Sequence, residues 1–245
     1  MALIDQIIPQ IWGEKGSADQ FKVTLSYAQT LDGSIALQRG TAFPMSSPES
    51  MKFTHQLRAN HQAIMVGIGT VLADNPRLTV RLVEGPHPQP IILDSHLRIP
   101  LGANLLDGLR PPWIITTLIA DREKAALLES KGARVLFLAN TSDGKIQLPA
   151  LMDILVELQI KSLMIEGGAT LITNILAEQL ADGLVLTITP FLSGGLRAVE
   201  RILVNAKAIS DDKLTFTLPR LEQTYSSQLG RDIVIWGHLK WGGQI

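Results

Sequence analysis

Three carboxylates stand where a chain could transfer protons or bind a ligand. Asp32 lies in an Asp-Gly turn, Asp74 in an Asp-Asn-Pro corner, and Glu166 directly before a Gly-Gly pair. A positioned carboxyl group can give or take a proton during a reaction. Taken alone, the Asp-Gly pair is better explained as a hairpin turn. We name all three acids as candidate catalytic residues, and the sequence does not rank them.

Two glycine-containing segments follow β-rich runs and open helical ones. They read Val-Gly-Ile-Gly-Thr at 66–70 and Ile-Glu-Gly-Gly-Ala-Thr at 165–170. Backbone N–H groups at such a joint, together with the helix dipole, favour a phosphate or carboxylate. The first segment has Leu72 where a dinucleotide fingerprint has its third glycine, which disfavours a Rossmann site. That segment fits a tight joint equally well, whereas Glu166 before two glycines favours a ligand site.

The stretch 73–81 combines an acid with arginines around a rigid corner. Asn75-Pro76 predicts a turn, so Asp74, Arg77 and Arg81 are held at fixed offsets. A carboxylate can accept hydrogen bonds from ring N–H groups, and a guanidinium can bind a phosphate through two hydrogen bonds. The pattern therefore suits a phosphorylated heterocycle. The alternative is a solvated loop whose ion pair contributes only about 0–1 kcal/mol.

Composition removes several classes of function. With 22 basic and 23 acidic residues, the net charge is −1, which gives no cationic field for nucleic acid. No cysteine is present, and the five histidines lack zinc-binding spacing, so we expect no metal site. Neither a P-loop nor a Gly-x-Ser-x-Gly elbow occurs. The sequence has no long apolar span or signal-peptide pattern, so we expect a cytoplasmic protein that does not enter membranes.

The elements that position these residues alternate between strand-like and helix-like runs. With 46% hydrophobic but only 5% aromatic residues, the composition is typical of aliphatic strands buried under helices. We expect residues 1–20 to be an N-terminal extension that packs on a single domain over 21–245. Strands are predicted at 22–28, 63–66, 90–94, 113–117, 134–138 and 162–166, and helices at 48–59, 121–131, 149–159 and 169–179. Strands at 184–189, 214–224 and 232–239 would add an antiparallel edge.

These motifs occur together in the order and spacing of one protein family. The chain resembles the reductase domain of the bifunctional riboflavin-biosynthesis deaminase/reductase and its stand-alone relatives, which are similar in fold to dihydrofolate reductase. The most specific pieces are Leu-Asp-Gly at 31–33, Leu-Arg-Ala at 57–59, the run 66–76, Leu-Thr-Val-Arg at 78–81, Leu-Asp-Ser at 93–95 and Glu-Gly-Gly at 166–168. The resemblance implies a three-layer α/β fold, with a mixed, mostly parallel sheet and antiparallel C-terminal strands.

The resemblance also implies a reaction and a set of contacts. NADPH would reduce the ribosylamino group of a 5′-phosphorylated pyrimidine, in its diamino or its deaminated form, to the ribitylamino product. Substrate contacts would come from Arg58, Leu78, Arg81 and Glu166. The cofactor would be held by Gly67, Gly69, Thr70, Asp74, Ser95, Gly167, Gly168, Ala169, Thr170, Leu171 and the residues that follow to Asn174, with Arg98 or Arg122 near a 2′-phosphate.

Two departures from the family bear on specificity. Residues 42–44 read Ala-Phe-Pro where the family commonly has Ser-x-Trp, and the deaminase domain with its zinc-ligand cysteines is absent from the sequence. One alternative is a dihydrofolate-reductase-like enzyme acting on another pterin or pyrimidine. A second is a non-catalytic nucleotide-binding homologue, against which the three acids argue. We expect a homodimer formed through the antiparallel strands.

Overall fold

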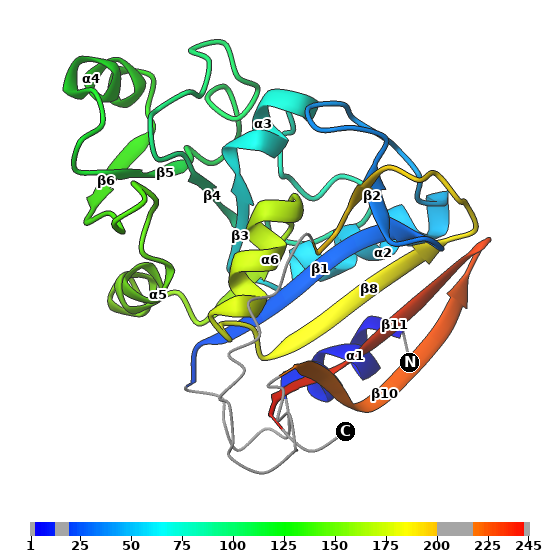
Figure 1. Cartoon of the computed structure of the whole chain (residues 1–245). Coiled ribbons are helices and arrows are strands. Elements are labelled where there is room, and N and C mark those ends of the chain that lie inside the picture. Colours follow the sequence, from blue (N-terminus) through cyan, green and yellow to red (C-terminus); the bar gives the residue numbers. More distant parts are fainter. Residues whose placement is uncertain (1–2, 13–19, 200–217, 243–245) are drawn as a thin grey trace.

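The computed structural model describes residues 3–12, 20–199 and 218–242. A nine-stranded sheet runs through this part of the chain in the order β10-β11-β8-β1-β7-β3-β4-β5-β6 (Figure 1). Its strands are β1 (Lys22–Thr30), β3 (Ala63–Gly67), β4 (Gln89–Leu93), β5 (Trp113–Thr117), β6 (Arg134–Leu138), β7 (Ser162–Ile165), β8 (Gly183–Thr189), β10 (Pro219–Leu229) and β11 (Asp232–Trp241). A second, two-stranded sheet pairs β2 (Ser34–Ala36) with β9 (Leu196–Arg197).

The main sheet is mixed but mostly parallel, as predicted. The strands from β6 to β8 pair in parallel throughout. Only β11 against β8, and β10 against β11, pair antiparallel. The predicted strand at 214–224 is placed too early, because β10 begins at Pro219 and continues to Leu229. Its first part, 214–217, lies outside the described residues.

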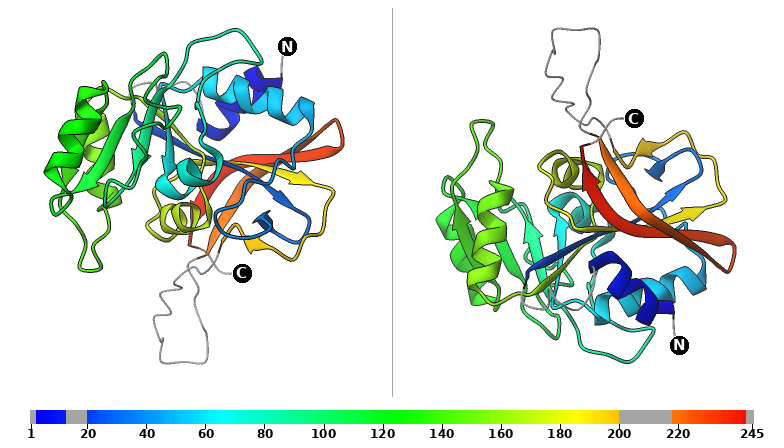
Figure 2. Two further views of the ribbon diagram at one scale, coloured as in Figure 1. Left: turned by 90° about the horizontal axis from the view of Figure 1, so that it is seen from above. Right: turned by 90° about the horizontal axis from the view of Figure 1, so that it is seen from below.

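Helices cover both faces of the sheet and make three layers (Figures 1 and 2). On one face, α5 (Leu148–Glu157) and α6 (Ala169–Ala177) pack on Met65 and Ile165. On the other face, α3 (Ile68–Asp74) and α4 (Arg122–Ser130) share an apolar core with Ile64, while α1 (Leu3–Trp12) and α2 (Pro48–Ala59) share one with Met164. Alternate residues of one strand thus feed opposite cores, which explains the near-continuous apolar runs of the central strands.

Residues 3–12 form the helix α1, which packs on the sheet and which the sequence pattern did not indicate. In α1, Ile7 and Ile11 are fully buried. A Cβ atom at Gly183 would lie 2.8 Å from Ile11 Cβ and 2.9 Å from the Ile11 carbonyl oxygen. Glycine at the start of β8 therefore lets α1 approach the sheet closely.

A buried polar chain joins α1 to the sheet and α2. The indole N–H of Trp12 donates to Thr24 Oγ1 at 2.9 Å. His61 bonds Thr24 Oγ1 through Nε2 at 2.8 Å and the Leu57 carbonyl through Nδ1 at 2.6 Å. Because a carbonyl only accepts, Nδ1 carries the proton and Nε2 accepts from the threonine hydroxyl. Burial lowers the pKa of His61 to about 4, so the ring is neutral at pH 7.

Acid should weaken the fold through this histidine. The unfolded chain binds a proton near pH 6.5 while folded His61 does so only at about 4. Its contribution is thus complete above pH 6.5 and is lost as the pH falls toward 4, at up to about 1.4 kcal/mol per pH unit. Urea denaturation of the wild type and His61→Gln from pH 7.5 to 4.5 measures this slope. We expect a shallower slope in His61→Gln but not in the exposed-site control His96→Gln; equal slopes in all three would contradict the assignment.

Candidate active site

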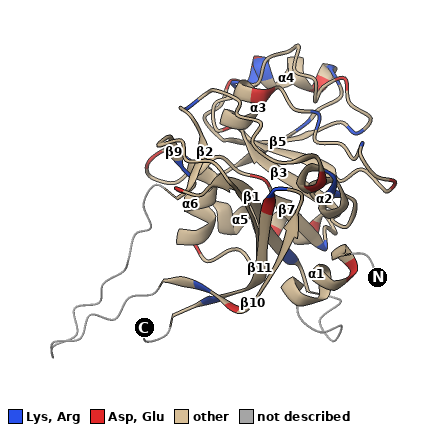
Figure 3. Cartoon of the chain, turned by 90° about the vertical axis from the view of Figure 1, so that its right-hand side faces the viewer, with Lys and Arg blue, Asp and Glu red and all other residues tan. Residues whose placement is uncertain are grey.

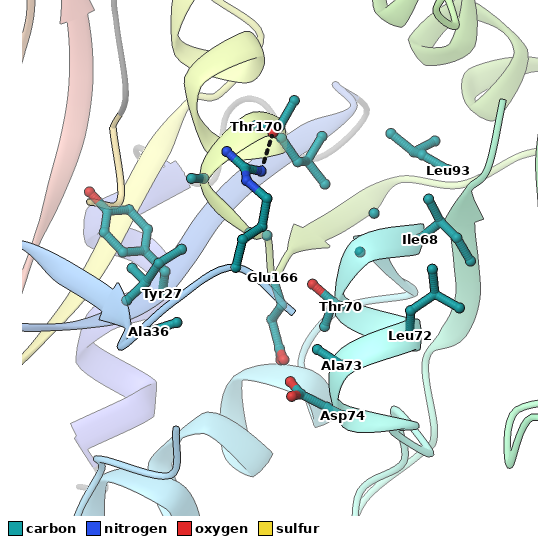
Figure 4. A pocket seen from close by; sticks show the side chains of 18 of the residues that line it. Tyr27, Ala36, Ile68, Thr70, Leu72, Ala73, Asp74, Leu93, Glu166 and Thr170 are labelled. Atoms are coloured by element: carbon teal, nitrogen blue, oxygen red, sulfur yellow. Dashed lines mark hydrogen bonds between the residues drawn. The ribbon is translucent and has the colours of Figure 1, made fainter. Parts of the chain in front are cut away.

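A cavity of about 840 Å³ opens at the carboxyl ends of β3, β4 and β7. Parallel strands place ligands at this edge of an α/β sheet. The first turns of α3 and α6 form two of its walls, and the segment after β2 lies across it (Figure 4). There Arg39 donates to Thr170 Oγ1 at 3.3 Å, the dashed line in Figure 4. The volume of the cavity is in the usual range for small-molecule and cofactor sites.

The two glycine-containing turns face each other across this cavity. Gly67 and Gly168 are the N-terminal caps of α3 and α6, and neither helix start has a side-chain cap. A Cβ atom at Gly168 would contact Thr70 Oγ1 at 3.8 Å, so the two turns are neighbours. At Gly167, an added Cβ would approach Leu171 to 3.2 Å, which is tighter than normal packing. The backbone N–H groups that begin α6 are therefore left for a ligand.

An ion pair between distant parts of the sequence forms another wall. Arg58, near the end of α2, donates from Nε and Nη2 to the two carboxylate oxygens of Glu166, each at 2.7 Å. Its Nη1 also donates to the Thr79 carbonyl at 3.2 Å. Burial opposes the charge of Arg58, but the facing Glu166 outweighs it and raises the pKa of the guanidinium. Both residues line the cavity, as the prediction that they contact substrate requires.

Asp74 ends α3 at the same cavity, close to Glu166. In Figure 4 the side chains of Asp74 and Glu166 point toward the same part of the cavity. Asn75 follows in the left-handed conformation, with φ 41°, which ends the helix at the predicted Asn-Pro corner. Partial burial raises the pKa of Asp74, so its protonated form is more accessible than that of a solvated aspartate.

Asp32 lies apart from the cavity lining and holds two loops together. Its carboxylate accepts from the Thr30 hydroxyl, from Ser34 Oγ at 3.1 Å, and from the backbone N–H groups of Ser193 and Gly194 at 3.2 and 2.6 Å. These hydrogen bonds, led by that of Thr30, lower the pKa of Asp32. The Asp-Gly pair does form a turn, in which Gly33 has φ 83° and its N–H donates to the Thr30 carbonyl at 2.9 Å, but the turn does not close a hairpin, because β1 and β2 belong to different sheets. A catalytic role for Asp32 stays a prediction.

Two predicted substrate contacts also lie outside the cavity lining. Leu78 is buried, with φ 52°, and the Arg81 side chain is exposed. The backbone N–H of Arg81 donates to Nδ1 of buried His55 at 2.9 Å. Burial is the first cause that lowers the pKa of His55 to about 4, and the charges of Arg58 and Arg81 add to it. Most of the predicted cofactor contacts do line the cavity: Gly67, Gly69, Thr70, Asp74, Ser95, Gly167, Gly168, Ala169, Thr170, Leu171 and Asn174. Ile172 and Thr173, which were also predicted, are not part of the lining.

Sequence reasoning missed two segments that line the cavity. One is the stretch from Gln38 to Thr41, just before the Ala42 and Phe43 positions that the resemblance had singled out, and the other is the Asp-Gly turn at 143–145 between β6 and α5. An Asp-Gly pair between a strand and a helix was a readable turn signal, but nothing in it indicates a ligand. Arg98 lines the cavity, whereas the guanidinium of Arg122 stacks 3.6 Å from the ring centre of Phe137 and is absent from the lining.

Removing one partner of the Arg58–Glu166 pair should destabilise the protein. In Glu166→Gln the guanidinium, whose side chain is only 10% exposed, loses its counter-ion, which lowers the free energy of unfolding by roughly 3 kcal/mol. Urea denaturation at pH 7 measures this. The control Arg58→Met/Glu166→Leu removes both charges and should be more stable than Glu166→Gln. If the free energy of unfolding of Glu166→Gln equalled that of the wild type, the pair would not stabilise the fold.

The chain is similar to known proteins over most of its length. The model of the RibD C-terminal domain family matches residues 21–235. RibD of Bacillus amyloliquefaciens is 36% identical over 213 residues, which cover 86% of this chain and 55% of that protein. RibD of Aquifex aeolicus is 38% identical over 190 residues, covering 74% of this chain and 52% of that protein. The chain thus spans about half the length of these RibD relatives.

Shorter relatives and solved structures agree. The 2,5-diamino-6-ribosylamino-4(3H)-pyrimidinone 5′-phosphate reductase of Methanothermobacter thermautotrophicus is 37% identical, over 87% of this chain and 95% of that protein. The structure of the riboflavin biosynthesis reductase Rib7 of Saccharomyces cerevisiae is 26% identical with a TM-score of 0.66, covering 94% of both chains. Acinetobacter baumannii RibD has the same fold, with a TM-score of 0.71 at 24% identity over 91% of this chain and 59% of that chain. This chain belongs to the RibD C-terminal domain family.

Proposed function

We propose that this protein is an NADPH-dependent reductase of riboflavin biosynthesis. Its substrate is a 5′-phosphorylated ribosylamino-pyrimidine, in the 2,5-diamino or the deaminated form, and its product is the ribitylamino compound. The observation that carries this proposal is the single cavity in which the α6 helix start, the Arg58–Glu166 pair and Asp74 meet. Relatives covering most of this chain bear the name of such a reductase.

The cavity suits a dinucleotide at the end formed by α3, α6 and β4. The capless start of α6 offers backbone N–H groups to a pyrophosphate, and Thr70 and Ser95 add hydroxyl groups. Arg98 is the arginine that we assign to the 2′-phosphate, because it lines the cavity and Arg122 stacks on Phe137 instead. When bound, the nicotinamide supplies the hydride, and the protein supplies position and exclusion of water.

The other end of the cavity suits the polar ring and sugar of the substrate. Glu166 is fixed by two hydrogen bonds to Arg58, so its carboxylate oxygens keep one orientation. The pair leaves acceptor capacity on the carboxylate for ring N–H groups. Burial lowers the pKa of Arg81, and the positive charges of Arg58 and then Arg77 lower it further. The three arginines are therefore near one another. This cationic group is our candidate for the 5′-phosphate.

Asp74 is our candidate for the proton transfer. The ribosyl ring must open to an imine before its C1′ accepts hydride, and the imine nitrogen takes up a proton in the same reduction. A carboxyl group with a raised pKa can donate that proton and is restored from solvent. Asp32, whose pKa is lowered and which does not line the cavity, is the weaker candidate.

Anaerobic loss of NADPH absorbance, with each form of the ribosylamino-pyrimidine phosphate, tests the function. We expect turnover with at least one form, and Asp74→Asn to lower kcat by about 100-fold while NADPH binding is retained. The matched control is Asp107→Asn, an exposed position outside the cavity lining, which should keep wild-type rates.

Each other outcome has a distinct meaning. If the wild type binds NADPH but turns over neither form, the substrate is another pterin or pyrimidine. If it binds neither NADPH nor NADH, the chain is not a nicotinamide-dependent reductase. If Asp74→Asn retains full kcat, the proton comes from another group or from water.

We also propose that the protein forms a homodimer and acts in the cytoplasm. β10 is an edge strand of 11 residues, and such an edge offers N–H and C=O groups to a second chain.

No helix among the described residues is long and apolar enough to cross a membrane. Acidic and basic residues are interspersed along the elements (Figure 3).

Light scattering of the purified protein tests the dimer. We expect twice the mass of one chain, and a lower mass on dilution of a variant with proline placed in β10, such as Gln228→Pro, because proline removes an N–H group from the ladder. A monomer mass at working concentration would refute the homodimer.

A further inference from the structure

A fully buried carboxylate lies beneath the loop that brings Arg98 to the cavity. Asp94 directly follows β4 and is 0% exposed. Its Oδ2 accepts from the backbone N–H of Ile99 at 2.8 Å, and its carbonyl accepts from Leu97 N at 3.2 Å. These two hydrogen bonds close the loop 94–99 on itself. Leu97 adopts the left-handed region, with φ 51°, so the loop turns sharply there.

The second oxygen of this carboxylate has an unusual environment. Oδ1 is buried and makes no hydrogen bond within the described residues. The cation that faces it is Arg98, whose Nε lies 4.0 Å away and whose side chain is 57% exposed. An unpaired buried charge is costly, so this carboxylate attracts the guanidinium that passes above it.

The two edges of the Arg98 guanidinium have different surroundings. Its Nε faces Asp94, the residue lines the cavity, and no hydrogen bond of the Arg98 side chain occurs within the described residues, so the terminal Nη groups have no hydrogen-bond partner there. Ser95 lines the same region, and its carbonyl is fixed by a 2.7 Å hydrogen bond from Thr117 Oγ1. Asp94 therefore lies below the loop while Ser95 and Arg98 present polar groups above it.

We propose that Asp94 is a positioning residue that sets the preference for NADPH over NADH. Its charge holds Arg98 with the Nη groups toward the ribose 2′-phosphate of the cofactor. Asp94 does not touch the cofactor; it acts through Arg98. This inference rests on the proposed function, because it presumes that the cavity takes a nicotinamide dinucleotide.

Calorimetric titration of the full chain with NADPH and with NADH tests the inference. Asp94→Asn keeps an oxygen for the Ile99 N–H group but removes the charge. We expect its Kd for NADPH to rise roughly tenfold, the effect of losing one charge-assisted hydrogen bond, with the Kd for NADH unchanged. Arg98→Gln should have the same signature, and the double variant should be no weaker than Arg98→Gln alone. Asp107→Asn is the control for an exposed acid.

Several results would overturn the proposal. Equal losses for both dinucleotides in Asp94→Asn would indicate a merely structural role, and additive losses in the double variant would mean that Asp94 does not act through Arg98. If Asp94→Asn does not fold, Arg98→Lys provides the test, because Arg98 is largely exposed and its substitution should not unfold the protein. Lysine keeps the positive charge but has no Nε group to face Asp94. A fully retained preference for NADPH in Arg98→Lys would therefore overturn the inference. A wild type that binds neither dinucleotide fails the proposed function itself, whereas dinucleotide binding with no change of preference fails only this inference.

Discussion

The Arg58–Glu166 pair is the contact on which the arrangement of the site depends. It joins α2 to the residue that follows β7, and the third guanidinium nitrogen reaches the Thr79 carbonyl in the arginine-bearing loop. Three segments that are distant in the sequence are thereby held at one point. Because the arginine is buried and charged, α2 and the segment after β7 cannot separate without leaving that charge unpaired, and the loop at Thr79 cannot leave without breaking a hydrogen bond to it. The ion pair therefore fixes this edge of the cavity.

The sheet and the glycines leave the backbone at the helix starts accessible to a ligand. β3 and β7 are neighbours, so both glycine-containing turns emerge at the same edge. Without side chains at Gly67 and Gly168, the helix starts stay open to the cavity, and the contact of Gly168 with Thr70 measures how near the two turns come. The site thus combines a charged wall with two helix starts whose first backbone N–H groups are not covered by a side chain at the cap position.

Local patterns predicted the central fold well. The aliphatic strands from β3 to β7 and their helices follow from hydrophobic runs and turn residues, because these signals lie within each segment. They also located the glycine turns and the Asp74 corner. The family resemblance, rather than the pattern, assigned both Arg58 and Glu166 to the substrate. Their pairing with each other was not predicted, since 108 positions separate them and their meeting depends on strand order.

Features set by tertiary contacts could not be predicted. α1 has a proline at position 9 and few residues, so its helical state depends on burial of Ile7 and Ile11 against the sheet. The stretch from Gln38 to Phe43 has no periodic pattern and reaches the cavity only because β1 and β2 direct it there. Asp94 was noted only as part of the Leu-Asp-Ser piece of the resemblance, and its burial under the next loop appears only in three dimensions.

The position of β1 has a consequence for how the chain folds as it is made. β1 begins at Lys22 and pairs with β7 on one side and β8 on the other, which begin at Ser162 and Gly183. During synthesis, both edges of this central strand wait for partners that the ribosome produces more than 130 residues later. Such non-local pairing is slow, and an open apolar strand is prone to association with other chains. The middle of this sheet cannot form until β7 and β8 have been made, so nascent chains stopped before β7 expose the first strand.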